Sequence, residues 1–122
     1  MLKSYDHQGI AFKDLPRAVA WYKEVLGLSE WAAAPGGAVM LQIAPGAYIE
    51  MMPASAAPRP ERAIADAGAS HLCFRVDDLD AAIARLDGFK VTWTNPVSPA
   101  VGGGRLRTFL DLEGNVLKIV QR

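Results

Sequence analysis

The only two histidines of the chain stand at the start of two similar stretches. His7 opens the stretch 7–15 and His71 opens the stretch 71–79, so an offset of 64 residues relates them. Each stretch has a histidine, then apolar residues at alternate positions, then Asp-Leu. Two similar copies, each about half of the chain, predict a duplicated module. A pseudo-twofold relation between the copies would bring the two histidines together.

A third residue, Glu50, stands within the strand-like stretch Tyr48–Met52. Because alternate residues of a strand point to opposite faces, Ile49 and Met51 belong to a buried face and Glu50 to the other, with the histidines. Borderline divalent metals accept two imidazoles and one carboxylate and keep positions open for water or substrate. Taken singly, each residue also suits a plain structural role as a satisfied or solvated polar side chain.

The elements that must position these residues follow the same order in each half. A strand leads to an aspartate that caps an amphipathic helix, and three strands follow. We expect helices over about Leu15–Leu26 and Leu79–Leu86, capped by Asp14 and Asp78, with Pro16 in the first turn and Gly27 and Gly88 as stops. The expected apolar stripes are Leu15, Val19, Tyr22 and Leu26 in the first helix and Leu79, Ile83 and Leu86 in the second. The later strands are expected over Leu28–Ala33, Ala38–Ala44, Ala47–Met52, Phe89–Thr94, Leu106–Asp111 and Val116–Val120.

The predicted fold class is therefore α+β, a single domain made of two βαβββ modules at about 1–53 and 69–122. A Pro- and Ala-rich linker, Pro53–Pro60, joins them, and a short helical turn around Glu61–Ala67 precedes the second module. Each helix covers one face of its sheet, so the faces with the histidines are left to enclose a shared hollow.

Composition excludes several classes of function. The 13 basic and 13 acidic residues give a formal net charge of zero, so nothing in the charge favours nucleic acid or an anionic membrane surface as a partner. The single cysteine, Cys73, cannot form an intramolecular disulfide. The N-terminal residues lack an apolar stretch, and turn residues interrupt the uncharged run Trp31–Ile49. We expect a soluble, cytoplasmic protein.

The chain resembles the vicinal oxygen chelate superfamily, the glyoxalase, bleomycin-resistance and extradiol-dioxygenase group. The resemblance covers nearly the whole length and depends on the order and spacing of several motifs. They are His7 followed by Asp14-Leu15, then Trp21–Leu28, Tyr48–Met51, Ser70–Val76 and Phe109–Asn115. It implies that the two modules form a cup-shaped sheet with the helices outside.

The resemblance also implies a metal site at the first and last strands of each module. Carried over, the metal ligands are His7, Glu50 and His71, and the fourth position, usually a glutamate, holds Lys118. A glyoxalase-like member would hold a divalent ion such as Ni, Zn, Mn or Fe, which polarises adjacent substrate oxygens and stabilises an enediolate-like intermediate. Glu50 and Lys118 are the candidate catalytic residues of such a lyase or isomerase.

Several roles are compatible with a lysine at position 118. Deprotonating a lysine at pH 7 costs roughly 4.6 kcal/mol, so Lys118 is a poor metal ligand. It would instead pair with Glu50 in place of the metal, provide a cation for a substrate carboxylate or enolate, or act as an amine of lowered pKa. The plain alternative is that it extends to solvent from the rim.

A Glu50–Lys118 pair would suit the rival function, a metal-free ligand- or drug-binding protein of the resistance type. In either case the candidate substrate-binding residues are Arg75, Trp31 and Trp93, and we expect a small-molecule ligand and a homodimer. The run Gly102–Gly104 precedes a predicted strand rather than a helix, so it is not a helix-terminal phosphate loop. We expect a lid over the cup or a surface loop there.

Overall fold

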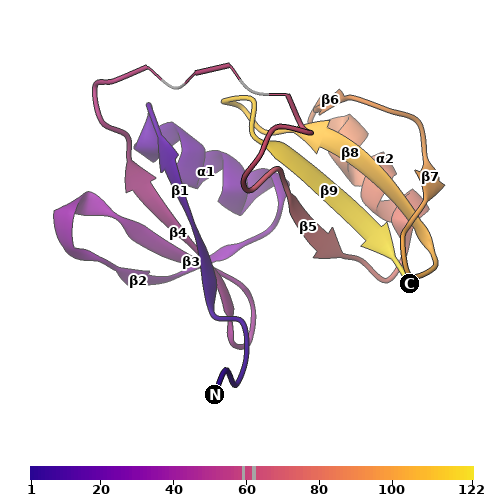
Figure 1. Ribbon diagram of the computed structural model, residues 1–122, viewed down its shortest axis with the longest axis horizontal. Helices are drawn as coiled ribbons and strands as arrows, with labels where there is room; N and C mark the ends of the chain where they lie inside the picture. The colour runs from indigo at the N-terminus through magenta and orange to yellow at the C-terminus, as the bar shows by residue number, and fades with distance from the viewer. Residues whose placement is uncertain (59, 62) are drawn as a thin grey trace. The chain divides into compact units, whose positions relative to one another are not determined.

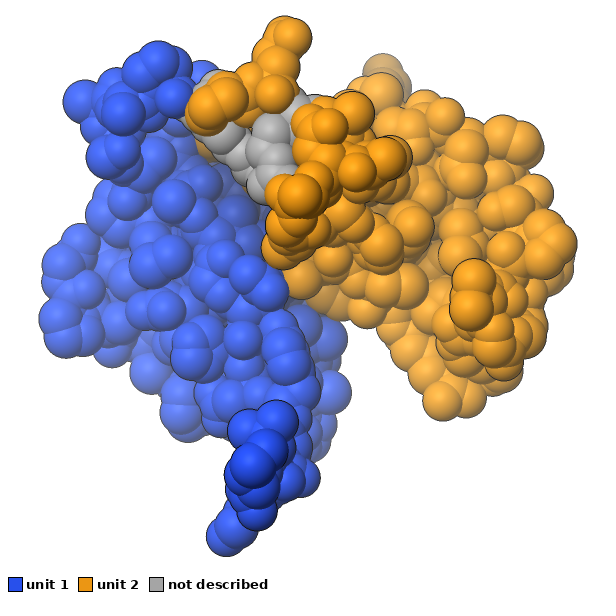
Figure 2. Space-filling view, in the orientation of Figure 1, with its two compact units in different colours: residues 1–59 blue, residues 60–122 orange. Residues whose placement is uncertain are grey.

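The computed structural model describes residues 1–58, 60–61 and 63–122 (Figure 1). The chain divides into two compact units, Met1–Arg59 and Pro60–Arg122, which Figure 2 colours separately.

Unit 1 places one helix against a four-stranded sheet. Its elements are β1 (His7–Phe12), α1 (Leu15–Val25), β2 (Ser29–Ala33), the short 3-10 helix η1 (Pro35–Gly37), β3 (Val39–Ala44) and β4 (Ala47–Pro53). The strand order is β1-β4-β3-β2, with β1 parallel to β4 and the other neighbours antiparallel. The chain therefore returns beside its own first strand at the end of the unit.

Unit 2 repeats this arrangement. Its elements are β5 (Leu72–Arg75), α2 (Leu79–Gly88), β6 (Thr92–Trp93), β7 (Ser98–Pro99), β8 (Arg105–Leu110) and β9 (Val116–Gln121). The strand order is β5-β9-β8-β6, with β5 parallel to β9 and the short β7 also paired with β8. The α+β class and the two βαβββ modules are confirmed, and β7 is an addition within the second module.

The strand registers confirm the repeat residue by residue. Gly9 of β1 lies opposite Glu50 of β4, and Cys73 of β5 lies opposite Lys118 of β9. Gly9 and Cys73 are related by the same 64-residue offset as the histidines. Glu50 and Lys118 therefore occupy equivalent positions in the two modules.

Both helices begin at the predicted aspartate caps. Asp14 Oδ1 accepts a hydrogen bond from the Arg17 amide at 3.1 Å, and Asp78 Oδ1 accepts one from the Ala81 amide at 2.9 Å. Each bond satisfies an amide that the first turn of a helix leaves without a backbone partner. In Figure 1, α1 and α2 each lie across one face of their own sheet.

The buried side of α1 differs from the predicted stripe. Ala18, Tyr22 and Val25 are buried, whereas Val19 and Leu26 are only half-buried. The Tyr22 ring meets the fully buried Phe12 ring of β1 edge to face, with their centroids 5.6 Å apart. A small side chain at Ala18 suits a helix that lies close to its sheet. A stripe predicted from the most hydrophobic residues leaves out such a small buried residue.

The end of α2 also differs from the prediction. The helix continues to Gly88, and the amides of Phe89 and Lys90 donate to the carbonyls of Leu86 and Asp87. Lys90 adopts the left-handed conformation, with φ of 56°, that usually falls to glycine at a helix end. The predicted strand over Phe89–Thr94 is consequently reduced to Thr92–Trp93.

The predicted helical turn over Glu61–Ala67 falls partly on Arg62, which lies outside the described residues. In its described part the Asp66 amide donates to the Ala63 carbonyl, which forms a turn rather than a helix. The first residue of the predicted linker, Pro53, belongs to β4. Within the described ranges, neither α1 nor α2 is long and apolar enough to span a membrane.

The turn between β8 and β9 is held by one buried carboxylate. Asp111 Oδ1 accepts from the amides of Glu113 at 2.9 Å and Asn115 at 2.8 Å, and Oδ2 accepts from Asn115 Nδ2 at 2.8 Å. Gly114 in this turn has a φ of 84°, which favours glycine. This turn fixes the start of β9, the strand that carries Lys118.

Replacing Asp111 should therefore destabilise the protein. We expect Asp111→Ala to lower the free energy of unfolding by about 2–3 kcal/mol, because it leaves two backbone amides without their acceptor. Urea denaturation followed by circular dichroism measures the change, and Asp77→Ala at an exposed position serves as the control. Equal stabilities of the two variants would contradict this role.

Candidate functional site

The side chains of chemical interest in unit 1 lie on the sheet face opposite α1. Ile49 and Met51 of β4 are fully buried on the helix side, so the alternation of the strand places Tyr48 and Glu50 on the other. His7 of β1 lies opposite Tyr48 in the register. We call this face, with His7, Tyr48 and Glu50, the histidine face of unit 1.

The His7 ring is oriented by the residue before it. Its Nδ1 lies 2.8 Å from Asp6 Oδ1, and an ionised carboxylate can only accept a hydrogen bond. The proton of a neutral imidazole therefore resides on Nδ1, and Nε2 carries the lone pair. Carboxylates hold metal-binding histidines in the same way.

On its other side, His7 Nε2 lies 3.6 Å from Glu50 Oε2. With Nδ1 protonated, a nitrogen lone pair and a carboxylate oxygen face one another, and both are acceptors. The repulsion between them is relieved when a positive charge lies between them, either a proton on Nε2 or a metal ion.

The separation of the two acceptors is close to what a metal ion requires. Nitrogen and oxygen ligands at about 2.0–2.2 Å from one zinc-sized ion lie about 3.0–3.4 Å apart. The side chains are partly exposed, at 42% for His7 and 30% for Glu50, so small rotations suffice to close the difference. The pair fits two ligands of a divalent cation.

Unit 2 presents a different environment at the equivalent face. It carries His71 just before β5, Cys73 and Arg75 on β5, and Lys118 on β9. His71 Nδ1 lies 2.6 Å from Ser70 Oγ. Burial lowers the pKa of His71 below its ordinary value, and the nearby Lys118 ammonium lowers this pKa further. The imidazole is therefore neutral at pH 7, with a lone pair available.

The residues before the two histidines were not singled out in the sequence. Asp6 and Ser70 are related by the same 64-residue offset, and each contacts Nδ1 of the histidine that follows it. Extending the repeat by one position toward the N-terminus would have found them.

An aromatic pair lies beside His7 in unit 1. Trp31 stacks on Tyr48 with their ring centroids 4.4 Å apart and their planes at 28°. The Trp31 side chain stands at a register shift between Glu30 and Ala32, a bulge that turns it toward the face of Tyr48. Trp31 remains 56% exposed, so a planar ligand can reach its outer surface. The alternation that placed Glu50 also identifies Tyr48, two residues before it.

Trp93 does not share the face of Lys118. Its indole Nε1 donates to Asp87 of α2 at 2.7 Å, and its ring meets the buried Phe109 ring with centroids 5.4 Å apart. Phe109 lies opposite the fully buried Leu117, on the helix side of the sheet. Within unit 2, Trp93 therefore lies on the helix side of the sheet, where it packs against α2.

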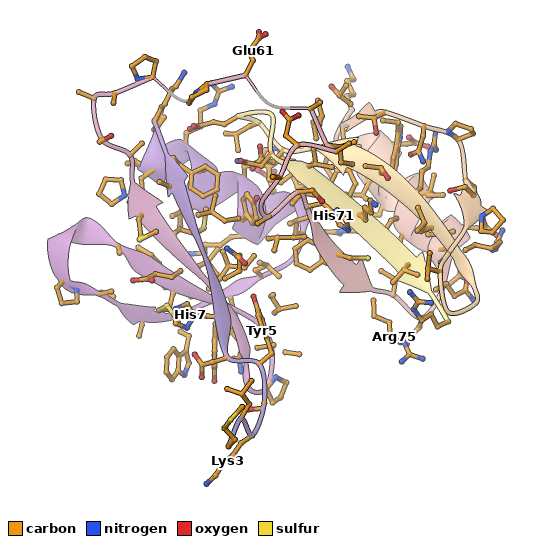
Figure 3. All side chains as sticks on the ribbon, viewed as in Figure 1. Lys3, Tyr5, His7, Glu61, His71 and Arg75 are labelled. Atoms are coloured by element: carbon orange, nitrogen blue, oxygen red, sulfur yellow. The ribbon has the colours of Figure 1, made fainter. Side chains whose placement is uncertain are left out.

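Arg75 lies at the far end of β5 from His71, as Figure 3 shows. Its Nη2 donates to the Arg122 carbonyl at 2.9 Å. Cys73, between them, is exposed and has a raised pKa, chiefly because of partial burial, with Lys118 and Arg122 acting in the opposite direction. Its thiol is therefore protonated at neutral pH.

The structure brings the predicted site residues together in two pairs, His7 with Glu50 in unit 1 and His71 with Lys118 in unit 2. Within either unit, the described residues form no group of three or more His, Cys, Asp or Glu side chains suited to hold a metal ion. A third ligand for the first pair must come from outside that pair, and the assignment of His71 as that ligand stays a prediction.

Comparison with known families gives one match over residues 4–119. The matching family is described as the Glyoxalase/Bleomycin resistance protein/Dioxygenase superfamily. No curated protein matches the sequence.

Solved structures with the same fold cover nearly the whole chain. A glyoxylase/bleomycin resistance protein/dioxygenase domain from Frankia sp. EAN1pec has a TM-score of 0.81 at 21% identity, covering 99% of this chain and 98% of its own. A lactoylglutathione lyase from Agrobacterium tumefaciens has a TM-score of 0.72 at 19% identity, covering 98% and 94%. The fosfomycin resistance protein FosX from Listeria monocytogenes has a TM-score of 0.74 at 21% identity, covering 100% and 95%. At these identities the likeness establishes the fold alone.

The environment of His71 predicts its titration. We expect its pKa to lie below the ordinary value of about 6.5 and to rise in Lys118→Met, because the repulsion by the ammonium is lost while burial remains. The Cε1 proton in an NMR titration reports this pKa, and Lys90→Asn removes a charge elsewhere in unit 2 as the control. An unchanged His71 pKa in Lys118→Met would contradict the contact.

The same shift sets the sign of a pH effect on stability. As the pH falls below about 6.5, the unfolded chain binds a proton at His71 before the folded chain does, so His71 lowers stability in that window and not above it. The pH range over which stability is lost runs from about 6.5 down to the folded-state pKa of His71. Lys118→Met should raise that folded-state pKa and so make this pH range narrower.

Proposed function

Because the chain belongs to the Glyoxalase/Bleomycin resistance protein/Dioxygenase superfamily, we propose that it is a metal-dependent lyase or isomerase of small oxygenated substrates. His7, Glu50 and His71 hold the divalent ion, which is Ni, Zn, Mn or Fe. The matching lactoylglutathione lyase fold supports this class of reaction.

One observation carries the proposal, the pair of acceptors formed by His7 Nε2 and Glu50 Oε2 at 3.6 Å. Asp6 keeps the imidazole proton on the far nitrogen, so the lone pair is directed at the carboxylate. A metal ligand requires both the free lone pair and the oriented ring that this arrangement provides.

A bound divalent ion supplies a Lewis acid that polarises a substrate oxygen. The chain's own residues orient the substrate and accept its charge. Trp31, stacked on Tyr48, provides a planar surface next to His7 for the body of the ligand. The Glu50 carboxylate accepts a proton from the substrate. Lys118 provides a positive charge for an anionic substrate oxygen.

Lys118 also favours a second candidate function, that of a metal-free ligand-binding protein. Its ammonium is close enough to His71 to lower the pKa of that imidazole, and a cation there opposes a dication nearby. In this case Lys118 pairs with Glu50 and takes the place of the ion. The FosX fold shows that resistance proteins share this architecture.

The metal content of the protein distinguishes the metal-dependent enzyme from the metal-free binding protein. We expect the purified protein to bind one equivalent of Ni or Zn per chain, and His7→Ala, Glu50→Gln and His71→Ala each to lower the affinity at least about tenfold. Isothermal titration calorimetry and elemental analysis measure both quantities. Glu30→Gln, at an exposed glutamate paired with Lys23, is the matched control for Glu50→Gln.

Absence of bound metal at every pH between 6 and 9 would contradict the metal-dependent reaction and favour the metal-free binding protein.

We also propose a homodimer. Mixing His7→Ala with His71→Ala then locates the ligands: recovery of metal binding in the mixed dimer places one site across two chains, and no recovery places it within one.

Lys118→Glu tests the effect of the ammonium. We expect this variant to bind the metal at least about tenfold more tightly than the wild type, since a repulsive charge becomes an attractive one. Titration calorimetry at fixed pH measures the ratio, with Lys3→Glu, on the exposed N-terminal arm, as the control for charge alone. An affinity unchanged from the wild type would place Lys118 away from the ion.

A further inference from the structure

The loop between β7 and β8 borders a shallow pocket that the proposed function does not use. Its volume is about 420 Å³, and it is lined by Gly102, Gly103, Gly104, Arg105, Gln121 and Arg122. All of these residues belong to unit 2, so the pocket is complete within one unit.

The loop is held in shape by a guanidinium. Arg122 Nη1 donates to the carbonyls of Val101 and Gly103, both at 2.6 Å. Gly104 has a φ of 85°, and a side chain there would collide with the Gln121 carbonyl. Glycine is therefore required at this position, because the loop backbone lies directly against the backbone of Gln121.

Arg105 carries a second positive charge to the pocket wall. Its Nη2 lies 3.3 Å from Asp80 Oδ2, but both side chains are at least half exposed, so this ion pair is weak. The same Nη2 is 3.5 Å from Gln121 Oε1. Within residues 1–58, 60–61 and 63–122, these contacts leave Nε and Nη1 of Arg105, and Nε and Nη2 of Arg122, without a protein acceptor.

Two guanidinium groups on a glycine loop match one kind of ligand. Planar guanidinium donors bind phosphoryl oxygens with two parallel hydrogen bonds. The Gly103 amide already donates to the Ala100 carbonyl at 3.0 Å, so the arginine side chains are the donors that a ligand would meet. The sequence excluded a helix-terminal phosphate loop because a strand follows the glycines, and β8 does begin at Arg105. Here the arginine side chains replace the helix terminus.

We propose that this pocket binds a phosphoryl group, with Arg105 and Arg122 as its ligands. The inference goes beyond the proposed function, because it involves neither the histidines nor a metal. The phosphoryl group belongs either to free phosphate or to a phosphate monoester, since both present the same phosphoryl oxygens to the two guanidinium groups.

The experiment titrates metal-free, EDTA-treated protein with inorganic phosphate at low ionic strength, followed by amide NMR. We expect saturable shifts of the Gly102–Gly104 amides, and at least tenfold weaker binding in Arg105→Gln. Arg105→Lys, which keeps the charge but loses the planar fork, should bind with intermediate affinity. Arg85→Gln removes an equal charge from α2 and should bind within twofold of the wild type.

Shifts that do not saturate, or equal affinities of Arg105→Gln and Arg85→Gln, would overturn the proposal. A parallel titration with glycerol 3-phosphate separates the two sources, since tighter binding than that of free phosphate identifies a monoester and equal binding identifies the free ion. Because metal is absent throughout, failure here leaves the metal proposal standing, and failure of metal binding leaves this site standing.

Discussion

Parallel pairing between the first and last strands of each unit is the constraint on which the candidate site depends. A helix lies between the paired strands in the sequence, because a parallel pair needs a long crossover connection. The pairing places Glu50 opposite Gly9 and Lys118 opposite Cys73. A methyl group on Gly9 would come within 3.1 Å of Met52 Cε and 3.9 Å of Glu50 Oε2. The Glu50 carboxylate therefore lies at ordinary contact distance from this point of β1, and only the flexible end of Met52 would have to shift for a side chain there.

The two units use equivalent positions with opposite electrostatic effects. In unit 1 the position holds a carboxylate that faces an imidazole lone pair, so the pair attracts a cation. In unit 2 it holds an ammonium that disfavours protonation of the neighbouring imidazole. In each unit the side chain before the histidine contacts Nδ1 and orients the ring, a carboxylate in one case and a hydroxyl in the other. Both imidazoles are thus oriented by the residue before them, whereas the charge at the equivalent positions of β4 and β9 is negative in one unit and positive in the other.

Much of this architecture is predictable from the sequence, because short-range rules determine it. The aspartate caps, the alternation along β4 and the offset of 64 residues identified both modules and the face of Glu50. Other features depend on tertiary packing. The buried side of α1 includes Ala18, because a small side chain lets the helix lie close to its sheet. After α2 ends at Gly88, Lys90 adopts the left-handed conformation that glycine usually provides. Trp93 donates a hydrogen bond to Asp87 on the helix side of the sheet. Its strand has only two residues, so the alternation of strand residues does not predict which side the indole takes.

The three tryptophans of the chain lie in different surroundings, which makes its intrinsic fluorescence informative. Trp21 meets the Tyr22 ring, with their centroids 5.2 Å apart, and Trp93 is hydrogen-bonded and covered by the Arg107 guanidinium. Trp31 is 56% exposed and stacks on Tyr48. A water-soluble quencher such as iodide therefore reaches Trp31 most readily. The emission of this one residue reports on whatever covers the surface beside His7, without any label attached to the protein.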